Sequence, residues 1–257
     1  MHKLTKTISL TILTIALASC ATTTQMTSGS DYLSRYTPSM TANLTTTSGT
    51  VDQQIRDIAA VEPDLRFPAR IGLARIERGQ LTNSPIDEIQ AWGDLAETLG
   101  APYGEFVPVS PFIAAMVRPE AKKGRRGTHN VIADIRRASA RQHLDYVLAY
   151  EVTQNSSQES NALSLANLTI LGLYVIPSRS VKINSTASAI LIDVRSGYPY
   201  GTATAFATDK NTRTALGSGK AKRKAKSNNY LQAVENLTGE VETMMKDLWV
   251  LQHKQQG

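Results

Sequence analysis

The sequence has 257 residues, a formal net charge of +6 and one cysteine. A chain of this length can bury a core as one or two domains, and its 41% hydrophobic and 19% charged residues are typical of a globular protein rather than a disordered or collagen-like one. One cysteine excludes an internal disulfide and excludes zinc or iron–sulfur sites built from several cysteines.

The first twenty residues have the layout of a secretory signal peptide. Lys3 and Lys6 form a short positive segment, and an apolar stretch follows over residues 8–17. That stretch is too short for a permanent membrane-spanning helix. Removal of residues 1–19 lowers the formal net charge from +6 to +4, which weakens any argument for nucleic-acid binding from overall charge.

The apolar stretch ends in Leu17-Ala18-Ser19-Cys20, which resembles the lipobox of bacterial lipoproteins. An ordinary signal peptide that happens to contain a cysteine is the alternative. The resemblance implies cleavage between Ser19 and Cys20, with diacylglycerol on the sulfur and an N-acyl chain such as palmitate on the new terminus; no other cofactor is expected. Several acyl chains form a stable membrane anchor. Ala21 follows the cysteine, which in the lipoprotein sorting pattern favours the outer membrane, facing the periplasm, over the inner membrane.

Residues 20–50 are predicted to be a lipidated tether. The segment 21–50 contains ten threonines, five serines and two charged residues, without helical or strand periodicity. Such a composition is typical of a flexible spacer. We therefore expect a signal peptide over 1–19, a tether over 20–50 and one periplasmic domain over 51–257.

The remaining sequence predicts strands and helices in alternation. The expected elements are a strand over 70–76, a helix over 85–99 with Ser84 as N-cap, a strand over 105–109, a helix over 128–143, a strand over 145–152 buried on both faces, a hairpin of strands 181–194 and 200–207, and a helix over 228–251. This order favours an α/β (mixed α+β) fold, with a mixed sheet packed by helices, a long β-hairpin and an amphipathic C-terminal helix.

Apolar residues at helical spacing predict which sides of the first two helices are buried. The inward residues are expected to be Ile86, Ile89, Leu95, Ala96 and Leu99 on the first helix, and Val131, Ile132, Ile135, Ala138 and Ala140 on the second. On the second helix Arg136, Arg137 and Arg141 are expected to point outward.

Three segments, 70–76, 132–152 and 185–205, resemble envelope lipoproteins around the curli-secretion-channel family and the TolB amino-terminal domain. The resemblance covers residues 69–249 and implies a scaffold or assembly component of the envelope, with no catalytic residues to carry over. Residues 171–203 also resemble the rhombotarget lipoproteins. Those usually end in a Gly-Gly, hydrophobic, basic tail that rhombosortase processes, whereas this sequence ends in Gln255-Gln256-Gly257, so that processing is not expected.

The sequence offers no catalytic or metal motif. No two of its four histidines are three or four residues apart, which leaves a helical metal site without its usual pair. Gly219-Lys220 resembles the end of a phosphate-binding loop, but Thr214 stands where the motif requires glycine and Ala221 where it requires serine or threonine. No GxSxG motif occurs. We therefore expect neither an enzyme nor a metal site.

Two basic stretches are candidate binding sites for an anionic partner. Both stretches are expected to be loops. Their cationic residues are Lys122, Lys123, Arg125 and Arg126 in one, and Lys210, Arg213, Lys220, Lys222, Arg223, Lys224 and Lys226 in the other, where no acid occurs over 210–234. They are either solvated segments or a surface for anionic lipid, lipopolysaccharide phosphate or an acidic envelope protein. Interleaved aromatic residues are absent, so no nucleic acid is expected as a partner.

Residues 161–178 form an uncharged segment whose apolar part is too short for a spanning helix. The alternatives are a buried sheet edge or core-covering loop, and a membrane-inserting or oligomer-forming hairpin. A pore hairpin should alternate apolar and polar residues, and this segment does not do so cleanly.

The sequence therefore favours a non-enzymatic outer-membrane lipoprotein whose periplasmic domain binds or assembles another cell-envelope component. The alternative is an oligomeric secretion-channel subunit of the curli-secretion type. A polysaccharide-binding module with Trp92 and Trp249 as platforms is a third hypothesis, although both residues fall where helix faces are expected to be buried. The partner and any homo-oligomer stay open at this point.

Overall fold

The computed structural model describes residues 21–34, 51–118, 130–160, 179–213 and 218–256. Several predictions fall outside these residues: the signal peptide with its cleavage site at Ser19 and Cys20, the basic stretch 122–126, and the uncharged segment 161–178.

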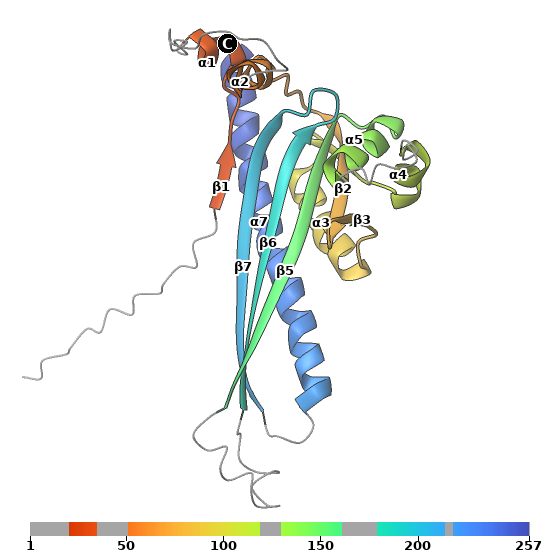
Figure 1. Cartoon of the computed structure of the whole chain (residues 1–257), viewed down its shortest axis with the longest axis vertical. Coiled ribbons are helices and arrows are strands. Elements are labelled where there is room, and N and C mark those ends of the chain that lie inside the picture. The colour runs from red at the N-terminus through yellow and green to blue at the C-terminus, as the bar shows by residue number, and fades with distance from the viewer. Residues whose placement is uncertain (1–20, 35–50, 119–129, 161–178, 214–217, 257) are drawn as a thin grey trace, which may run out of the picture.

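The fold is a mixed seven-stranded sheet with helices on both faces (Figure 1). The strands are β1 (Ala21–Thr24), β2 (Ala69–Glu77), β3 (Gln80–Thr82), β4 (Gly104–Pro108), β5 (Tyr146–Ser160), β6 (Arg179–Asp193) and β7 (Pro199–Arg213). Their order is β1-β7-β6-β5-β2-β3, and β4 also pairs with β2. The predicted mixed α+β fold is confirmed, and β6 and β7 form the expected hairpin.

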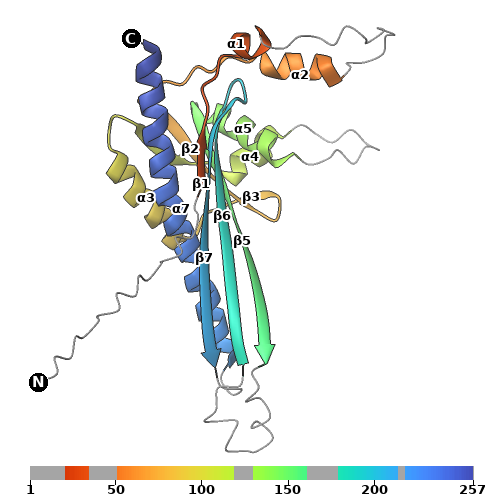
Figure 2. The ribbon, with the colours of Figure 1, turned by 90° about the vertical axis from the view of Figure 1, so that its left-hand side faces the viewer.

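The described helices cover the two faces of the sheet unequally. They are α1 (Gly29–Ser34), α2 (Val51–Ala59), α3 (Ile86–Leu99), α4 (Pro111–Val117), α5 (Val131–Arg141) and α7 (Ser218–Gln256). Figure 2 shows α3 and α7 on one face and α4 and α5 on the other. Because β2 is parallel to both β4 and β5, the chain must cross over the sheet between them, and α3, α4 and α5 lie in these crossovers.

The main core lies between the sheet and the helices α3 and α7. Small buried residues on the sheet are Ala187, Ala189, Ala203, Ala205 and Ala207. Large residues on α7 are Leu237, Val241, Met244, Met245 and Leu248, each 0% exposed. Small side chains let the helix approach the sheet, so that the large ones fill the space between them at interior density. A second, smaller core lies under α4 and α5 around Ile135 and Val147.

Towards the lower end of Figure 1, α7 continues along the long strands with a small and partly polar contact. Ala225 packs against Ile183 there. Ser185 Oγ donates to Asn229 Oδ1 at 2.7 Å, and Gln154 Nε2 donates to Ser185 Oγ at 3.0 Å. Because the apolar periodicity fades in this part of α7, the sequence predicted a helix from residue 228, whereas it begins at Ser218.

Opposite this part of α7, the lower half of the sheet carries no described helix (Figure 2). Exposed or half-buried polar residues on this face are Thr153, Asn155, Asn184, Thr186, Thr204 and Thr208. The prediction that the strand over 145–152 is buried on both faces is therefore correct for Tyr146 to Tyr150 and wrong from Glu151 on, where exposed and half-buried residues alternate.

Part of the predicted tether has regular structure. β1 pairs antiparallel with β7, with Ala21 opposite Thr204 and Thr24 opposite Gly201, and α1 follows. The expectation that residues 21–34 lack a strand or helix was wrong. A four-residue threonine-rich edge strand has no apolar alternation of its own, because its stability comes from hydrogen bonds to β7 and not from a buried face.

The helix α3 is rotated relative to its predicted orientation. Ile86 and Ile89 are 81% and 46% exposed, while Glu88 and Trp92 are buried. Pro85 is the N-cap residue, and the predicted cap Ser84 instead hydrogen-bonds Tyr150 Oη at 2.8 Å. The rotation follows from an ion pair of Glu88 with the sheet, described below, which no apolar pattern reveals.

Helix α5 differs from its prediction in a similar way. Asp134 and Ser139 are buried, whereas Ala140 is exposed. The buried Asp134 carboxylate pairs with Arg118 and Arg137 at 3.0 and 2.9 Å. Arg136, expected to point outward, is only half-exposed and bonds carbonyl groups of the β6–β7 turn.

Truncation of the α7 core should destabilise the protein more than truncation of its exposed side. We expect Leu237→Ala to lower the free energy of unfolding by about 2–5 kcal/mol, because Leu237 is fully buried and leaves a cavity. Val250→Ala, on the same helix at a 49% exposed position, should cost under about 0.5–1 kcal/mol. Urea denaturation measures both, and equal losses would contradict the assigned packing of α7.

Candidate functional site

The predicted basic residues that the structure describes lie at one end of the molecule. Lys220, Lys222, Arg223, Lys224 and Lys226 form the first turns of α7. Arg223 and Lys224 are exposed and Lys226 is half-buried. The Lys226 carbonyl accepts a hydrogen bond from Gln154 Nε2 at 2.8 Å, which fixes the helix start on β5.

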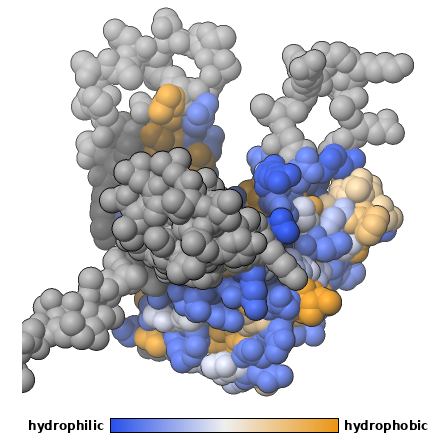
Figure 3. Space-filling view, turned by 90° about the horizontal axis from the view of Figure 1, so that it is seen from below, coloured by the Kyte–Doolittle hydropathy of each residue, from blue (hydrophilic) through white to orange (hydrophobic). Residues whose placement is uncertain are grey.

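The predicted basic residues Lys210 and Arg213 belong to β7 and those over 220–226 to α7, so the expectation of a loop was wrong for these residues. The strand register brings Arg179 and Lys182 of β6 to this same end. Arg179 of β6 pairs with Arg213 of β7, and Lys182 pairs with Lys210. We call these four residues and the five basic residues of α7 the basic end. It lies at the bottom of Figure 1. Seen from below, the coloured surface around the grey residues is mainly hydrophilic (Figure 3). The acids in the adjoining strand ends are Glu159 and Asp209.

The arrangement of the basic end is unfavourable for folding by itself. Cations in the first turn of a helix oppose the helix dipole by a few tenths of a kcal/mol to about 1 kcal/mol each. Conflicts of this kind between local preference and fold are expected at functional sites. The basic end is therefore the strongest candidate for a binding surface that sequence and structure indicate together.

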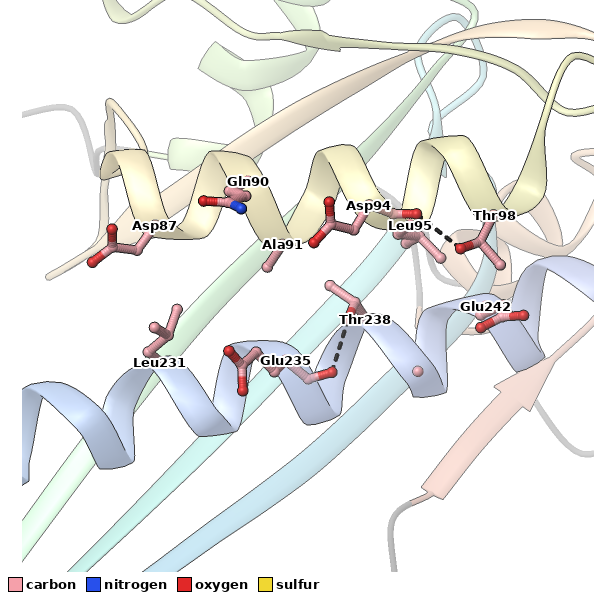
Figure 4. Close-up of a pocket in the computed structure, with 11 residues that line it drawn as sticks. Asp87, Gln90, Ala91, Asp94, Leu95, Thr98, Leu231, Glu235, Thr238 and Glu242 are labelled. Atoms are coloured by element: carbon pink, nitrogen blue, oxygen red, sulfur yellow. Dashed lines mark hydrogen bonds between the residues drawn. The ribbon is translucent and has the colours of Figure 1, made fainter.

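A second feature is an acidic groove between α3 and α7 (Figure 4). It has a volume of ≈ 490 Å³, and its lining carboxylates are Asp87 and Asp94 of α3 and Glu235 and Glu242 of α7. Lys246 Nζ lies 2.6 Å from the Glu242 carboxylate. Among the described residues, no group of three or more His, Cys, Asp or Glu is placed to hold a metal ion.

No single segment of the sequence predicts this groove. Its acids belong to two helices more than a hundred residues apart, and only the packing of α3 on α7 brings them together. Its charge is opposite to that of the basic end, so the long molecule carries positive and negative surfaces at separate places.

A buried polar cluster links α3, α7 and the strands β2 and β5. Arg75 of β2 donates through Nε to Glu88 at 3.0 and 3.2 Å, through Nη1 to Glu77 at 2.7 Å, and through Nη2 to Tyr230 Oη at 2.8 Å. Tyr150 Oη of β5 donates to Glu88 at 2.7 Å.

The charge states of this cluster are held in place by its contacts. Burial raises the pKa of Tyr150, and the Glu88 carboxylate raises it further. Burial works against the charged Arg75, but the hydrogen bond to Glu77 and the charge of Glu88 outweigh it, so the pKa of Arg75 is raised. Tyr150 therefore stays neutral and Arg75 stays charged near neutral pH, as expected for a cluster with a structural role.

The two tryptophans do not form an exposed aromatic platform. Trp92 is 1% exposed and packs against Tyr150, with ring centroids 4.9 Å apart. Trp249 is half-buried, and its ring lies near those of Phe67 and His253, at 6.0 and 4.4 Å. The helix-face positions expected for both residues agree with this packing.

No helix among the described residues is both long and apolar enough to cross a membrane.

No protein-family model matches the sequence, and no curated protein matches it. Solved structures that are similar include a minor lipoprotein from Acinetobacter baumannii, with 11% identity and a TM-score of 0.35 over 69% of this chain and 90% of that chain. The PelC dodecamer from Paraburkholderia phytofirmans has 13% identity and a TM-score of 0.30 over 71% and 91%. Lipoprotein GNA1162 from Neisseria meningitidis has 19% identity and a TM-score of 0.29 over 63% and 96%. TM-scores this low do not establish a common function.

The buried ion pair should contribute far more to stability than an exposed one. We expect Glu88→Gln to lower the free energy of unfolding by about 3–5 kcal/mol, because it leaves the buried Arg75 guanidinium without its buried counter-charge and with only the exposed Glu77 as an anionic partner. Glu242→Gln removes the more exposed pair with Lys246 and should cost at most about 1 kcal/mol. Urea denaturation distinguishes the two, and a loss below 1 kcal/mol for Glu88→Gln would contradict the assigned role of the cluster.

Proposed function

We propose that this protein is a non-enzymatic lipoprotein of the bacterial outer membrane that faces the periplasm and binds an anionic envelope surface through its basic end. The observation that carries the proposal is the position of β1. Ala21, the residue after the lipobox cysteine, already pairs with Thr204 in the sheet.

A lipid anchor on Cys20 would therefore lie next to the folded body. Neighbouring Cα atoms across a trans peptide are about 3.8 Å apart, so no spacer separates the anchor from the sheet edge. From Thr204, β7 runs nine residues on to Arg213, about 30 Å at 3.3 Å per residue. With the anchor in the bilayer, the basic end lies within one strand length of the lipid headgroups.

The lipid anchor and the basic end then contribute to membrane binding in different ways. The acyl chains supply stable attachment. Basic residues near an anionic membrane surface add about 1 kcal/mol each, which suffices to fix how the long body lies against that surface. Lipid phosphate, lipopolysaccharide phosphate and an acidic envelope protein share the chemistry that such a surface recognises.

A secretion-channel subunit is the second candidate, and the length of the strands favours it. β5, β6 and β7 have 15 residues each, more than the 9–11 residues that cross an outer membrane. The packing of α7 along one face of these strands counts against a secretion-channel subunit. A ring-shaped oligomer that conducts ions in planar bilayers would favour this candidate over the first.

Lipidation is tested by metabolic labelling with radioactive palmitate. We expect label on the wild-type protein and none on Cys20→Ala, because only the thiol accepts the diacylglycerol. Ser19→Ala is the matched control, since it keeps a small residue before the cysteine and should keep the label. Equal labelling of wild-type and Cys20→Ala protein would overturn the anchor.

The basic end is tested by vesicle binding of an unlipidated chain that starts at Ala21. All described elements lie within 21–256, so we expect this chain to retain the described fold. Arg223→Glu with Lys224→Glu should weaken binding to vesicles containing anionic lipid at least tenfold, because two exposed cations become anions.

The matched control for that experiment is Arg141→Glu with Lys254→Glu. These two exposed cations lie away from the basic end, and their reversal changes the net charge equally. We expect it to have little effect on vesicle binding. An equal loss in both double variants would indicate a response to overall charge and contradict a localised surface.

A further inference from the structure

A cavity of ≈ 610 Å³ lies at the end of the molecule opposite the basic end. Its walls come from α1, α2, α5 and the turn between β6 and β7, in the upper part of Figure 1. Most of its lining is apolar, with Tyr32 from α1, Ile55 and Ile58 from α2, and Tyr198 from the turn. Neither the proposed anchor nor the basic end uses it.

The walls are tied together by hydrogen bonds. The Glu62 carboxylate, just after α2, accepts the backbone N–H groups of Gly29 at 3.0 Å and Ser30 at 2.8 Å, which holds α1 against α2. Gln25 Nε2 donates to the Pro199 carbonyl at 2.8 Å and joins the segment before α1 to the hairpin. The cavity is thus bounded by connected elements rather than by independent loops.

Arg136 of α5 contributes a cation that is held over the β6–β7 turn. Its Nε donates to the Val194 carbonyl at 3.2 Å and its Nη2 to the Arg195 carbonyl at 2.7 Å. Gly197 has φ +80°, and a Cβ there would lie 2.8 Å from Arg136 Nη1. Glycine at this turn therefore provides both the left-handed backbone and the room that the guanidinium occupies.

This guanidinium has no carboxylate partner in the part of the chain that the structure describes. Among the described residues, none of the ion pairs within 4.0 Å involves Arg136, whereas its neighbour Arg137 pairs with Asp134 at 2.9 Å. Arg136 is also the one charged residue among the described residues that line the cavity. The nearby Glu62 carboxylate is engaged by the α1 backbone. A half-buried cation beside apolar walls is stabilised when an anion pairs with it.

We propose that this cavity binds an anionic amphiphile with a single apolar chain. Its carboxylate or phosphate pairs with Arg136, and its apolar chain lies against Tyr32, Ile55 and Ile58. Two of these residues, Tyr32 and Ile58, are 50% and 75% exposed without a ligand, and exposed apolar side chains around a cavity are typical of a binding site. The volume is within the 300–1,000 Å³ that small-molecule sites occupy.

The direct test is calorimetric titration of the chain starting at Ala21, below micelle concentrations. The probes share a twelve-carbon chain: dodecanoate, dodecyl phosphate and dodecyltrimethylammonium. We expect at least one anion to bind at least tenfold more tightly than the cation. Binding of dodecanoate alone assigns a carboxylate ligand, and binding of dodecyl phosphate alone a phosphate ligand. Equal affinity for the cation, or no binding of either anion, would overturn the proposal.

Two substitutions on α5 test whether Arg136 is the residue that binds the anion. Arg136→Gln should weaken anion binding at least tenfold, while Arg137→Gln, the adjacent position on α5, should leave it within twofold. Because Arg136 also binds the turn, the folding of Arg136→Gln is checked by urea denaturation.

A second pair of variants does not depend on that contact. Ile58→Asp, at a 75% exposed position, should lower affinity at least tenfold, and Ile86→Asp, at an 81% exposed position on α3 outside the cavity, should not. Unchanged binding in Ile58→Asp would place the ligand elsewhere and overturn the assignment.

Discussion

The Arg75–Glu88 ion pair is the contact on which the arrangement of the elements depends. It is buried between β2 and α3, and its remaining donors and acceptors are satisfied by Tyr150 of β5, Tyr230 of α7 and Glu77. A buried pair is stable only when such bonds offset its desolvation, so all these elements must meet in one geometry. The pair turns Glu88 inward on α3. Asp87 and Asp94 then face the groove towards α7, which gives the outer side of the molecule its acidic surface.

Helix α7 connects this centre to the basic end. Its buried residues pack on the alanines of β6 and β7, and its first turns continue along the strands through Ala225 and Asn229. The stability gained in the apolar part tolerates a run of cations at the helix start, where the helix dipole disfavours them. The same helix therefore supplies both the core and the cationic residues that we propose bind an anionic surface.

The described surface has basic, acidic and apolar regions at different places along the long axis of the molecule. Cations gather where β6, β7 and α7 meet at the lower end, acids line the α3–α7 groove, and the apolar cavity with Arg136 lies at the upper end. β1 enters the sheet between these ends, at Thr204 of β7. A lipid on the preceding cysteine would therefore hold the side of the sheet, which leaves both ends free for binding.

The sequence by itself determined the order of the main strands and helices, the mixed sheet, the hairpin and the closing helix, because local periodicity and turn residues encode them. It also indicated the basic residues of α7 and, through the lipobox, the hypothesis of an anchor at Cys20. It did not reveal β1, the rotation of α3, the acidic groove or the position of Arg136. Each of these features depends on a contact with another segment of the chain. β1 pairs through Ala21 with Thr204, and the rotation of α3 follows from the pair of Glu88 with Arg75. The acidic groove requires α3 to pack on α7, and the carbonyl groups of Val194 and Arg195 hold Arg136. Hydrogen bonds and ion pairs between distant segments leave no period in the sequence, so only the tertiary structure decided them.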